Sequence, residues 1–102
     1  MRIRVLRRAQ YQLRQIFEYI ESEFGETVAD SFQQEVIEKG ERIRKYPDAG
    51  HPEPLLIGHK RNYRYVIIGK HNKMLYYVSG ETIVVADIWD MRMNPDKLKR
   101  HI

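Results

Sequence analysis

The chain has 102 residues, no cysteine, a formal net charge of +4 and 31% charged residues. This length predicts one domain over residues 1–102, with room for one sheet and one layer of helices. A disulfide framework is excluded, and no apolar run approaches the roughly 18 residues that would cross a bilayer. We therefore expect a cytoplasmic protein with no membrane partner.

The charges are unevenly distributed along the chain. Residues 18–53 hold ten of the fourteen acidic residues and only four Lys or Arg, a local balance of −6, whereas the remainder has a balance of +10. Residues 54–80 contain no acidic residue at all. This distribution favours an anionic partner for the basic half, with nucleic acid as the first candidate, and the alternative is a solvated basic face without a partner.

The first half of the chain predicts a strand followed by two helices. Residues 2–6 alternate charged and apolar side chains, which predicts a half-buried strand that joins a sheet from a distance. From about Arg8 the apolar spacing is helical, and Gly25 is placed to end this helix. A second helix should begin at residues 26–27 and end at Tyr46, which precedes a proline. The two apolar stripes are Leu13, Ile16, Phe17, Ile20 and Phe24, and Val28, Phe32, Val36, Gly40 and Ile43.

The remaining non-sheet segments are a loop and a tail. Residues 47–60 contain three prolines and two glycines, which predicts a loop, and residues 55–57 within it should dip back into the core. Residues 91–102 form a polar tail in which residues 96–102 either make one helical turn or stay mobile.

Three runs of β-branched and aromatic residues, at about 61–68, 73–79 and 82–90, are separated by turn residues. This pattern predicts a three-stranded antiparallel meander. The predicted fold class is therefore α+β, in the order β-α-α-β-β-β, with a twisted antiparallel sheet and the helical hairpin packed on one face. The other face, or part of it, should be open to solvent.

Few residues predict chemistry directly. The four histidines lack metal-ligand spacing, and no glycine-rich phosphate loop is present, so neither a metal nor a small-molecule cofactor is expected. Glu53 stands between two prolines beside the basic sheet, where it is either a general base for a hydroxyl such as a ribose 2′-OH or a surface glutamate. Asp90 and Arg92 suggest a structural salt bridge, and Trp89 is either a core anchor or a partner contact. Basic residues interleaved with tyrosine suit single-stranded nucleic acid, although tyrosine is also common in strands; the candidates are Lys60, Arg61, Arg64, Lys70 and Tyr77.

The order of elements and several single positions resemble the RelE/ParE superfamily of toxins from type II toxin–antitoxin modules. The similarity covers nearly the whole chain. The positions that carry it are Ala9, Leu13, Ile16, Tyr19 and Ile20, then Ala29, Phe32, Pro47, Gly50 and Tyr76, and the ending Asp90-Met91-Arg92-Met93-Asn94-Pro95.

This resemblance implies a small toxin neutralised by a cognate antitoxin, and either of two activities. RelE-like members cleave mRNA on the ribosome without a metal, whereas ParE-like members inhibit DNA gyrase and are not enzymes. The segment 51–55 looks like the loop that carries the catalytic glutamate of YoeB-type nucleases, with Glu53 at the matching place. Lys73 stands where those nucleases have an arginine, Arg92 could resemble an active-site arginine of RelE, and the C-terminal His-Tyr pair has no counterpart.

The first hypothesis is a ribosome-dependent, metal-independent mRNA endoribonuclease with Glu53 as base and Lys73 and Arg92 stabilising transition-state charge. The second is a non-enzymatic toxin that blocks DNA gyrase, for which residues 89–102 and the helical hairpin would matter more than Glu53. The third is a degenerate family member without toxicity. Either toxin interpretation predicts a mostly apolar groove for the antitoxin.

Overall fold

The computed structural model describes residues 1–101. It contains three α-helices, two 3-10 helices and five strands within this part of the chain. In chain order they are β1 (Arg2–Val5), α1 (Arg7–Phe24), α2 (Glu26–Lys45), η1 (Pro47–Ala49), β2 (His51–Pro52), η2 (Pro54–Leu56), β3 (Arg64–Ile68), β4 (Asn72–Ser79), β5 (Thr82–Asp90) and α3 (Pro95–His101). The predicted β-α-α-β-β-β order is confirmed, and the tail prediction of a helical turn is confirmed as far as residue 101, with residue 102 outside the described part.

The sheet has the strand order β1-β5-β4-β3-β2. Strands β2 to β5 are antiparallel neighbours, as the meander predicts, but β1 runs parallel to β5. The sheet is therefore mixed rather than fully antiparallel. No short turn joins β1 to β5, so the relative direction of these two strands is set by the long path between them and not by a hairpin.

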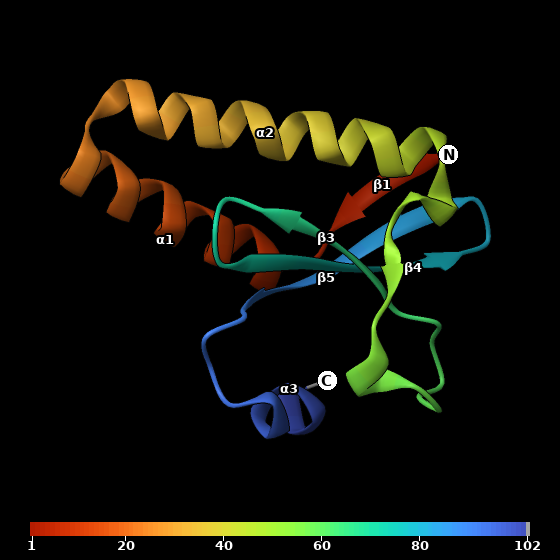
Figure 1. Ribbon diagram of the computed structural model, residues 1–102. Coiled ribbons are helices and arrows are strands. Elements are labelled where there is room, and N and C mark those ends of the chain that lie inside the picture. Colours follow the sequence, from red (N-terminus) through yellow and green to blue (C-terminus); the bar gives the residue numbers. More distant parts are fainter. Residues whose placement is uncertain (102) are drawn as a thin grey trace.

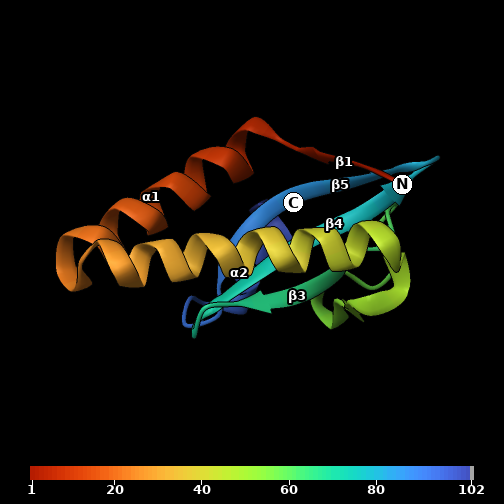
Figure 2. The same ribbon diagram turned by 90° about the horizontal axis from the view of Figure 1, so that it is seen from above.

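The helical hairpin of α1 and α2 covers one face of the sheet (Figures 1 and 2). The core between the two layers joins helix residues to apolar side chains of β3, β4 and β5, with Leu13, Ile16, Ile20 and Val36 packed at its margin. Its buried members are Ala9, Phe32, Ile43, Ile68, Met74, Tyr76, Ile83, Val85 and Ile88. No helix in residues 1–101 is both long enough and apolar enough to cross a membrane.

The tip of the hairpin extends beyond the sheet (Figure 2), and the side chains at this end of the two predicted apolar stripes are exposed. Tyr19, Phe24 and Val28 are 61%, 64% and 48% exposed. The rings of Tyr19 and Phe24 contact each other edge to face, with centroids 6.5 Å apart. These three residues are called the hairpin tip below.

The second face of the sheet is covered only in part. Helix α3 packs its buried Leu98 against Leu75 and Trp89, and Leu55 from η2 joins this small second core. Trp89 is thus a core anchor, one of the two roles that the sequence left open. The remainder of this face, called the open face below, carries the polar and aromatic groups described in the next subsection.

A β-bulge in β5 decides which side chains reach each face. Leu75 lies opposite Asp87 and Tyr76 lies opposite Val85, so β5 holds one extra residue, Ala86, between these pairs. Because the alternation is shifted there, Val85 and Ile88 both pack toward the helices. Asp87, opposite Leu75, is directed to the open face.

Tyr76 fixes the loop after α2 to the sheet. Its hydroxyl donates to the Pro47 carbonyl at 2.7 Å and accepts from the Gly50 N–H at 2.9 Å. Arg64 adds a third connection, because its Nη1 donates to the Gly50 carbonyl at 2.7 Å. The chain therefore enters η2 from a fixed position.

Burial raises the pKa of the Tyr76 phenol above its ordinary value, because the charged phenolate would lose its hydration. Because this pKa is higher in the folded chain than in the unfolded chain, the buried neutral phenol contributes fully to the free energy of unfolding below about pH 10. The contribution is lost as the pH rises through the folded-state pKa. We expect Tyr76→Phe to be less stable at pH 7, by about 1–3 kcal/mol for the two groups left without a partner. We also expect its free energy of unfolding to decline less steeply above pH 10 than that of the wild type, measured by urea unfolding between pH 7 and 11. An equal decline in both proteins would contradict the buried phenol as the cause.

Candidate functional site

Glu53 and Lys73 form an ion pair under the edge of the open face. The Lys73 Nζ lies 2.9 Å from one Glu53 carboxylate oxygen and 3.2 Å from the other. The Glu53 side chain is fully buried, and that of Lys73 is 14% exposed. The structure thus brings together two of the three residues predicted to be catalytic, and both partners of the pair are shielded from water.

The local sequence explains this burial. Glu53 precedes η2 as its N-cap residue, and its carboxylate accepts a hydrogen bond from the Leu55 N–H at 3.3 Å. Its own N–H donates to the Tyr63 carbonyl at 2.9 Å, which holds the segment beside the start of β3. Lys73 lies with its Nζ 4.4 Å from the ring centroid of Tyr65, a cation–π contact. The carboxylate therefore has partners inside the chain for both of its oxygens.

A row of aromatic and basic groups lies on the open face. The Arg61 guanidinium is 4.4 Å from the ring centroid of Tyr77, and the Tyr77 ring contacts that of Tyr63 edge to face at 5.4 Å. His59 extends the row through an edge-to-face contact with Tyr63 at 5.3 Å. Tyr77 and Tyr63 are half-buried, and Arg61 and His59 are exposed. Two of the five predicted nucleic-acid-binding residues, Arg61 and Tyr77, thus lie in direct contact.

The other three predicted nucleic-acid-binding residues lie elsewhere. Arg64 has its side chain directed to the loop after α2, where it bonds the Gly50 carbonyl and lies 3.6 Å from an Asp48 carboxylate oxygen. Lys70 is exposed in the turn between β3 and β4, and Lys60 is exposed in the loop before β3. These positions follow from the strand register, in which Arg64 lies opposite Tyr76.

Arg92, the third residue predicted to be catalytic, is paired with Asp90. Its Nη2 lies 2.7 Å from one Asp90 oxygen and its Nε 3.0 Å from the other, so the predicted salt bridge is present. Hydrogen bonding and charge from Arg92 lower the pKa of Asp90 below its ordinary value. The Arg92 side chain is 67% exposed and lies just after the end of β5.

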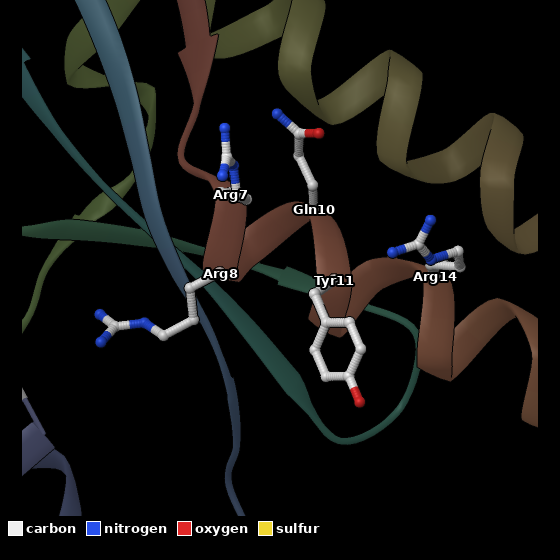
Figure 3. A pocket seen from close by; sticks show the side chains of 5 residues that line it. All are labelled: Arg7, Arg8, Gln10, Tyr11 and Arg14. Atoms are coloured by element: carbon white, nitrogen blue, oxygen red, sulfur yellow. The ribbon is translucent and has the colours of Figure 1, made fainter.

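The sequence interpretation missed a group of residues at the start of α1. Arg7, Arg8, Gln10, Tyr11 and Arg14 line an open hollow (Figure 3). These five residues are called the arginine surface below. A signal for it was present in the sequence, because the first acidic residue of the chain is Glu18, whereas five arginines precede it.

Asp87 is a second feature that the sequence did not predict as part of a site. It is completely buried, and Arg8 lies with its Nε 3.4 Å from the Asp87 Oδ1. This contact exists because β1 ends at Val5, opposite Val85, so the edge of β5 beyond that point meets the first turns of α1 instead of a strand. Gln12 of α1 contacts the same edge of β5, where its Oε1 accepts a hydrogen bond from the Ile88 N–H at 2.8 Å.

A second hollow is lined by Glu38, Lys39, Glu41, Arg42, Lys45 and Tyr46. These two hollows are open and carry charged side chains, and the apolar groove for an antitoxin stays a prediction. Within residues 1–101 no three His, Asp or Glu side chains lie together in a way that could hold a metal ion.

Comparisons with known proteins support the fold and its family. The family model for the ParE toxin of the type II toxin–antitoxin system parDE matches residues 3–95. Among solved structures, one described as the chromosomal ParDE toxin–antitoxin system from P. aeruginosa superposes with a TM-score of 0.70 at 18% identity, over 88% of this chain and 95% of that chain. No curated protein sequence matches the chain. The predicted RelE/ParE-like fold is therefore confirmed.

Proposed function

The chain belongs to the ParE toxin family of type II toxin–antitoxin systems, and we propose that it is a non-enzymatic toxin that inhibits DNA gyrase in the cytoplasm. The observation that carries this proposal is the match to the ParE family model over residues 3–95. Of the two activities that the sequence resemblance implied, gyrase inhibition is the one associated with the ParE branch. The endoribonuclease interpretation, which the sequence placed first, has less support.

The geometry around Glu53 also favours a non-enzymatic toxin. A general base must reach within hydrogen-bond distance of the proton that it removes, directly or through one water. Glu53 is 2% exposed, and its carboxylate is held by Lys73 and the Leu55 N–H. A messenger RNA would have to open this ion pair before its 2′-OH met the carboxylate. Arg92, bonded to Asp90, is likewise engaged within the chain.

Inhibition by binding requires an exposed contact surface, and the hairpin tip offers one. Phe24 and Tyr19 are in contact and more than half exposed, and Val28, in the first turn of α2, is 48% exposed. Exposed apolar groups that gather in one place are typical of protein-binding surfaces. We propose that the tip contacts gyrase and that a cognate antitoxin neutralises the toxin by preventing this contact.

The test is a supercoiling assay with purified gyrase, relaxed plasmid and ATP, run beside a translation reaction in which message integrity is followed. We expect the wild-type chain to reduce supercoiling and to leave the message intact. Glu53→Gln, compared at equal folded fraction measured by circular dichroism, should inhibit gyrase as the wild type does. Cuts inside the translated message together with unaltered supercoiling would reject gyrase inhibition and support an endoribonuclease. If those cuts were lost in Glu53→Gln, Glu53 would be assigned as its general base.

A matched pair of variants tests the contact surface. Phe24→Ser changes the hairpin tip, whereas Tyr46→Ser changes a side chain of similar exposure, 66% against 64%, at the opposite end of α2. We expect the toxin concentration for half-inhibition to rise about tenfold or more in Phe24→Ser, because truncating a central aromatic contact typically costs more than 1 kcal/mol of binding energy. Tyr46→Ser should inhibit as the wild type does. Equal effects of the two substitutions would reject the tip as the contact.

A further inference from the structure

The arginine surface concentrates positive charge, of which only Arg8 has an acidic partner, the buried Asp87. Arg7, Arg8 and Arg14 lie within the first eight residues of α1, and the first turn of this helix contains no acidic side chain. Figure 3 shows the labelled side chains projecting from the first turns of the helix around the hollow. Like charges that outnumber their counter-charges oppose folding, so a ligand that neutralises them would relieve this cost.

Three other arginines of the chain have partners that explain them structurally. Arg44 is bonded to Glu41, Arg64 to the Gly50 carbonyl, and Arg92 to Asp90. In contrast, the side chains of Arg7 and Arg14 make no ion pair and no hydrogen bond with any other described residue.

Arg8 links this surface to the aromatic row of the open face. Its Nε is directed to Asp87, which leaves its two terminal nitrogens for other contacts, and its side chain is 43% exposed. The pKa of Tyr63 is raised mainly by burial, and the charges of Arg61 and Arg8 both act to lower it, so both guanidinium groups lie near this tyrosine. A basic path therefore runs from the start of α1, past Asp87, to the pair of Arg61 and Tyr77.

The chemistry along this path suits phosphate and bases. Guanidinium groups present donors in a fork that matches phosphate oxygens, and tyrosine rings provide faces on which bases stack. Tyr11 is 51% exposed beside Arg14, whose guanidinium lies 6.0 Å from the centroid of its ring. The carboxylates of an acidic protein segment would use the charges, but they offer no planar base-like face to the rings. We propose that the arginine surface, continued by Arg61 and Tyr77, binds the phosphodiester backbone of nucleic acid.

This inference goes beyond gyrase inhibition and does not depend on it, because the binding is measured with the toxin and nucleic acid alone. The probes are a fluorescein-labelled 20-nucleotide DNA strand, the same sequence as a duplex, and the same sequence as RNA. Binding is followed by fluorescence anisotropy from 50 to 200 mM NaCl. We expect saturable binding that weakens as salt increases, and tighter binding of the single strands than of the duplex would indicate that the rings take part.

The decisive variant is Arg7→Gln/Arg14→Gln, whose matched control is Arg42→Gln/Lys45→Gln. Both pairs remove two positive charges from exposed positions on a helix, but the control pair lines the other hollow, beside Glu38 and Glu41. We expect the first variant to weaken binding about tenfold and to reduce the slope of log Kobs against log salt by about 1.4 for a single strand or about 1.8 for a duplex. The control should bind within about twofold of the wild type.

Three results would overturn the proposal. The first is an absence of saturable binding to any of the probes at 50 mM NaCl, and the second is an equal loss of affinity in both double variants, which would indicate attraction by net charge alone. The third is polyglutamate of the same number of charges binding as tightly as the nucleic acids, which would assign the surface to an acidic protein instead. Urea unfolding of each variant verifies that a lost affinity does not come from a lost fold.

Discussion

Lys73→Met is expected to lower the free energy of unfolding by about 3–5 kcal/mol, because it leaves the Glu53 carboxylate buried without its cation. Methionine keeps most of the length of the lysine stem, so the loss is one of charge rather than of volume. The Lys73 side chain is 14% exposed, so some water can approach the site, and the lower end of this range is the more reasonable value. Urea unfolding at pH 7 measures the change.

The double variant Glu53→Gln/Lys73→Met is the control for this mechanism. The glutamine carbonyl can still accept from the Leu55 N–H, as one oxygen of Glu53 does, but no charge remains to be buried. We expect the double variant to be more stable than Lys73→Met and within about 1–2 kcal/mol of the wild type. If Lys73→Met unfolds at the same urea concentration as the wild type, the ion pair contributes nothing to the free energy of unfolding. Burial of the Glu53 carboxylate then does not depend on Lys73.

Gly50→Ala is the second substitution for which we expect a large loss. An added Cβ would lie 2.5 Å from the Tyr76 hydroxyl oxygen and 2.8 Å from the Tyr65 carbonyl oxygen, and the second of these is backbone. The glycine has an ordinary φ of −77°, so the cost comes from crowding and not from backbone strain. Overpacking of this kind costs about 1–3 kcal/mol, and displacement of the hydrogen bond from the Gly50 N–H to Tyr76 places the expected loss near the upper end.

Gly40→Ala provides the matched control, since the chemical change is identical. Gly40 lies inside α2, and its added Cβ would meet only the Ile3 side chain, at an ordinary 3.6 Å. Alanine is a better helix former than glycine by about 0.8–1.0 kcal/mol, so the control should be slightly more stable than the wild type. Thermal or urea unfolding of both proteins gives the comparison. Equal stabilities would mean that the loop after α2 moves aside without cost.

These two expectations concern the same segment, residues 47–56. It is held to the sheet by Tyr76 and Arg64 at its start and by Glu53 and Lys73 further on. The segment that the sequence interpretation regarded as a catalytic loop is thus held to the sheet at several points, and its catalytic role stays a prediction. Loss of toxicity on changing Glu53 is therefore informative about chemistry only when the folded fraction has been measured.

Local sequence patterns predicted the elements well, because each depends on residues close in the chain. The helical spacing of apolar residues, Gly25 between the helices and the glycine-containing turns placed α1, α2 and the meander within a few residues of their observed bounds. Strand β3 begins at Arg64 rather than at residue 61, because its pairing with β2 and β4 begins at Arg64, opposite Pro52 and Tyr76. The two-residue strand β2 carried no signal, since it contains a proline and is defined only by its pairing to β3.

The partners of charged side chains could not be predicted in this way. Residues 53 and 73 are twenty positions apart, and Arg8 and Asp87 are separated by almost the whole chain, so only packing brings each pair together. Strict alternation also fails across β5, because the bulge at Ala86 reverses which face its later residues occupy. The sequence predicted Glu53, Arg61 and Tyr77 as candidate functional residues. It did not show which charged side chains have a partner of opposite charge in the folded chain.

The sequence by itself thus determined the order of elements, the family and the concentration of positive charge. Each of these depends on the composition of the chain and on the spacing of residues close together in it. The tertiary structure alone decided that Glu53 is buried against Lys73, that Arg64 anchors a loop, and that Arg8 meets the buried Asp87 while Arg7 and Arg14 stay exposed at the start of α1. The physical reason is that burial and ion pairing depend on distances across the folded chain. Those distances follow from strand register, the bulge at Ala86 and the point at which β1 ends.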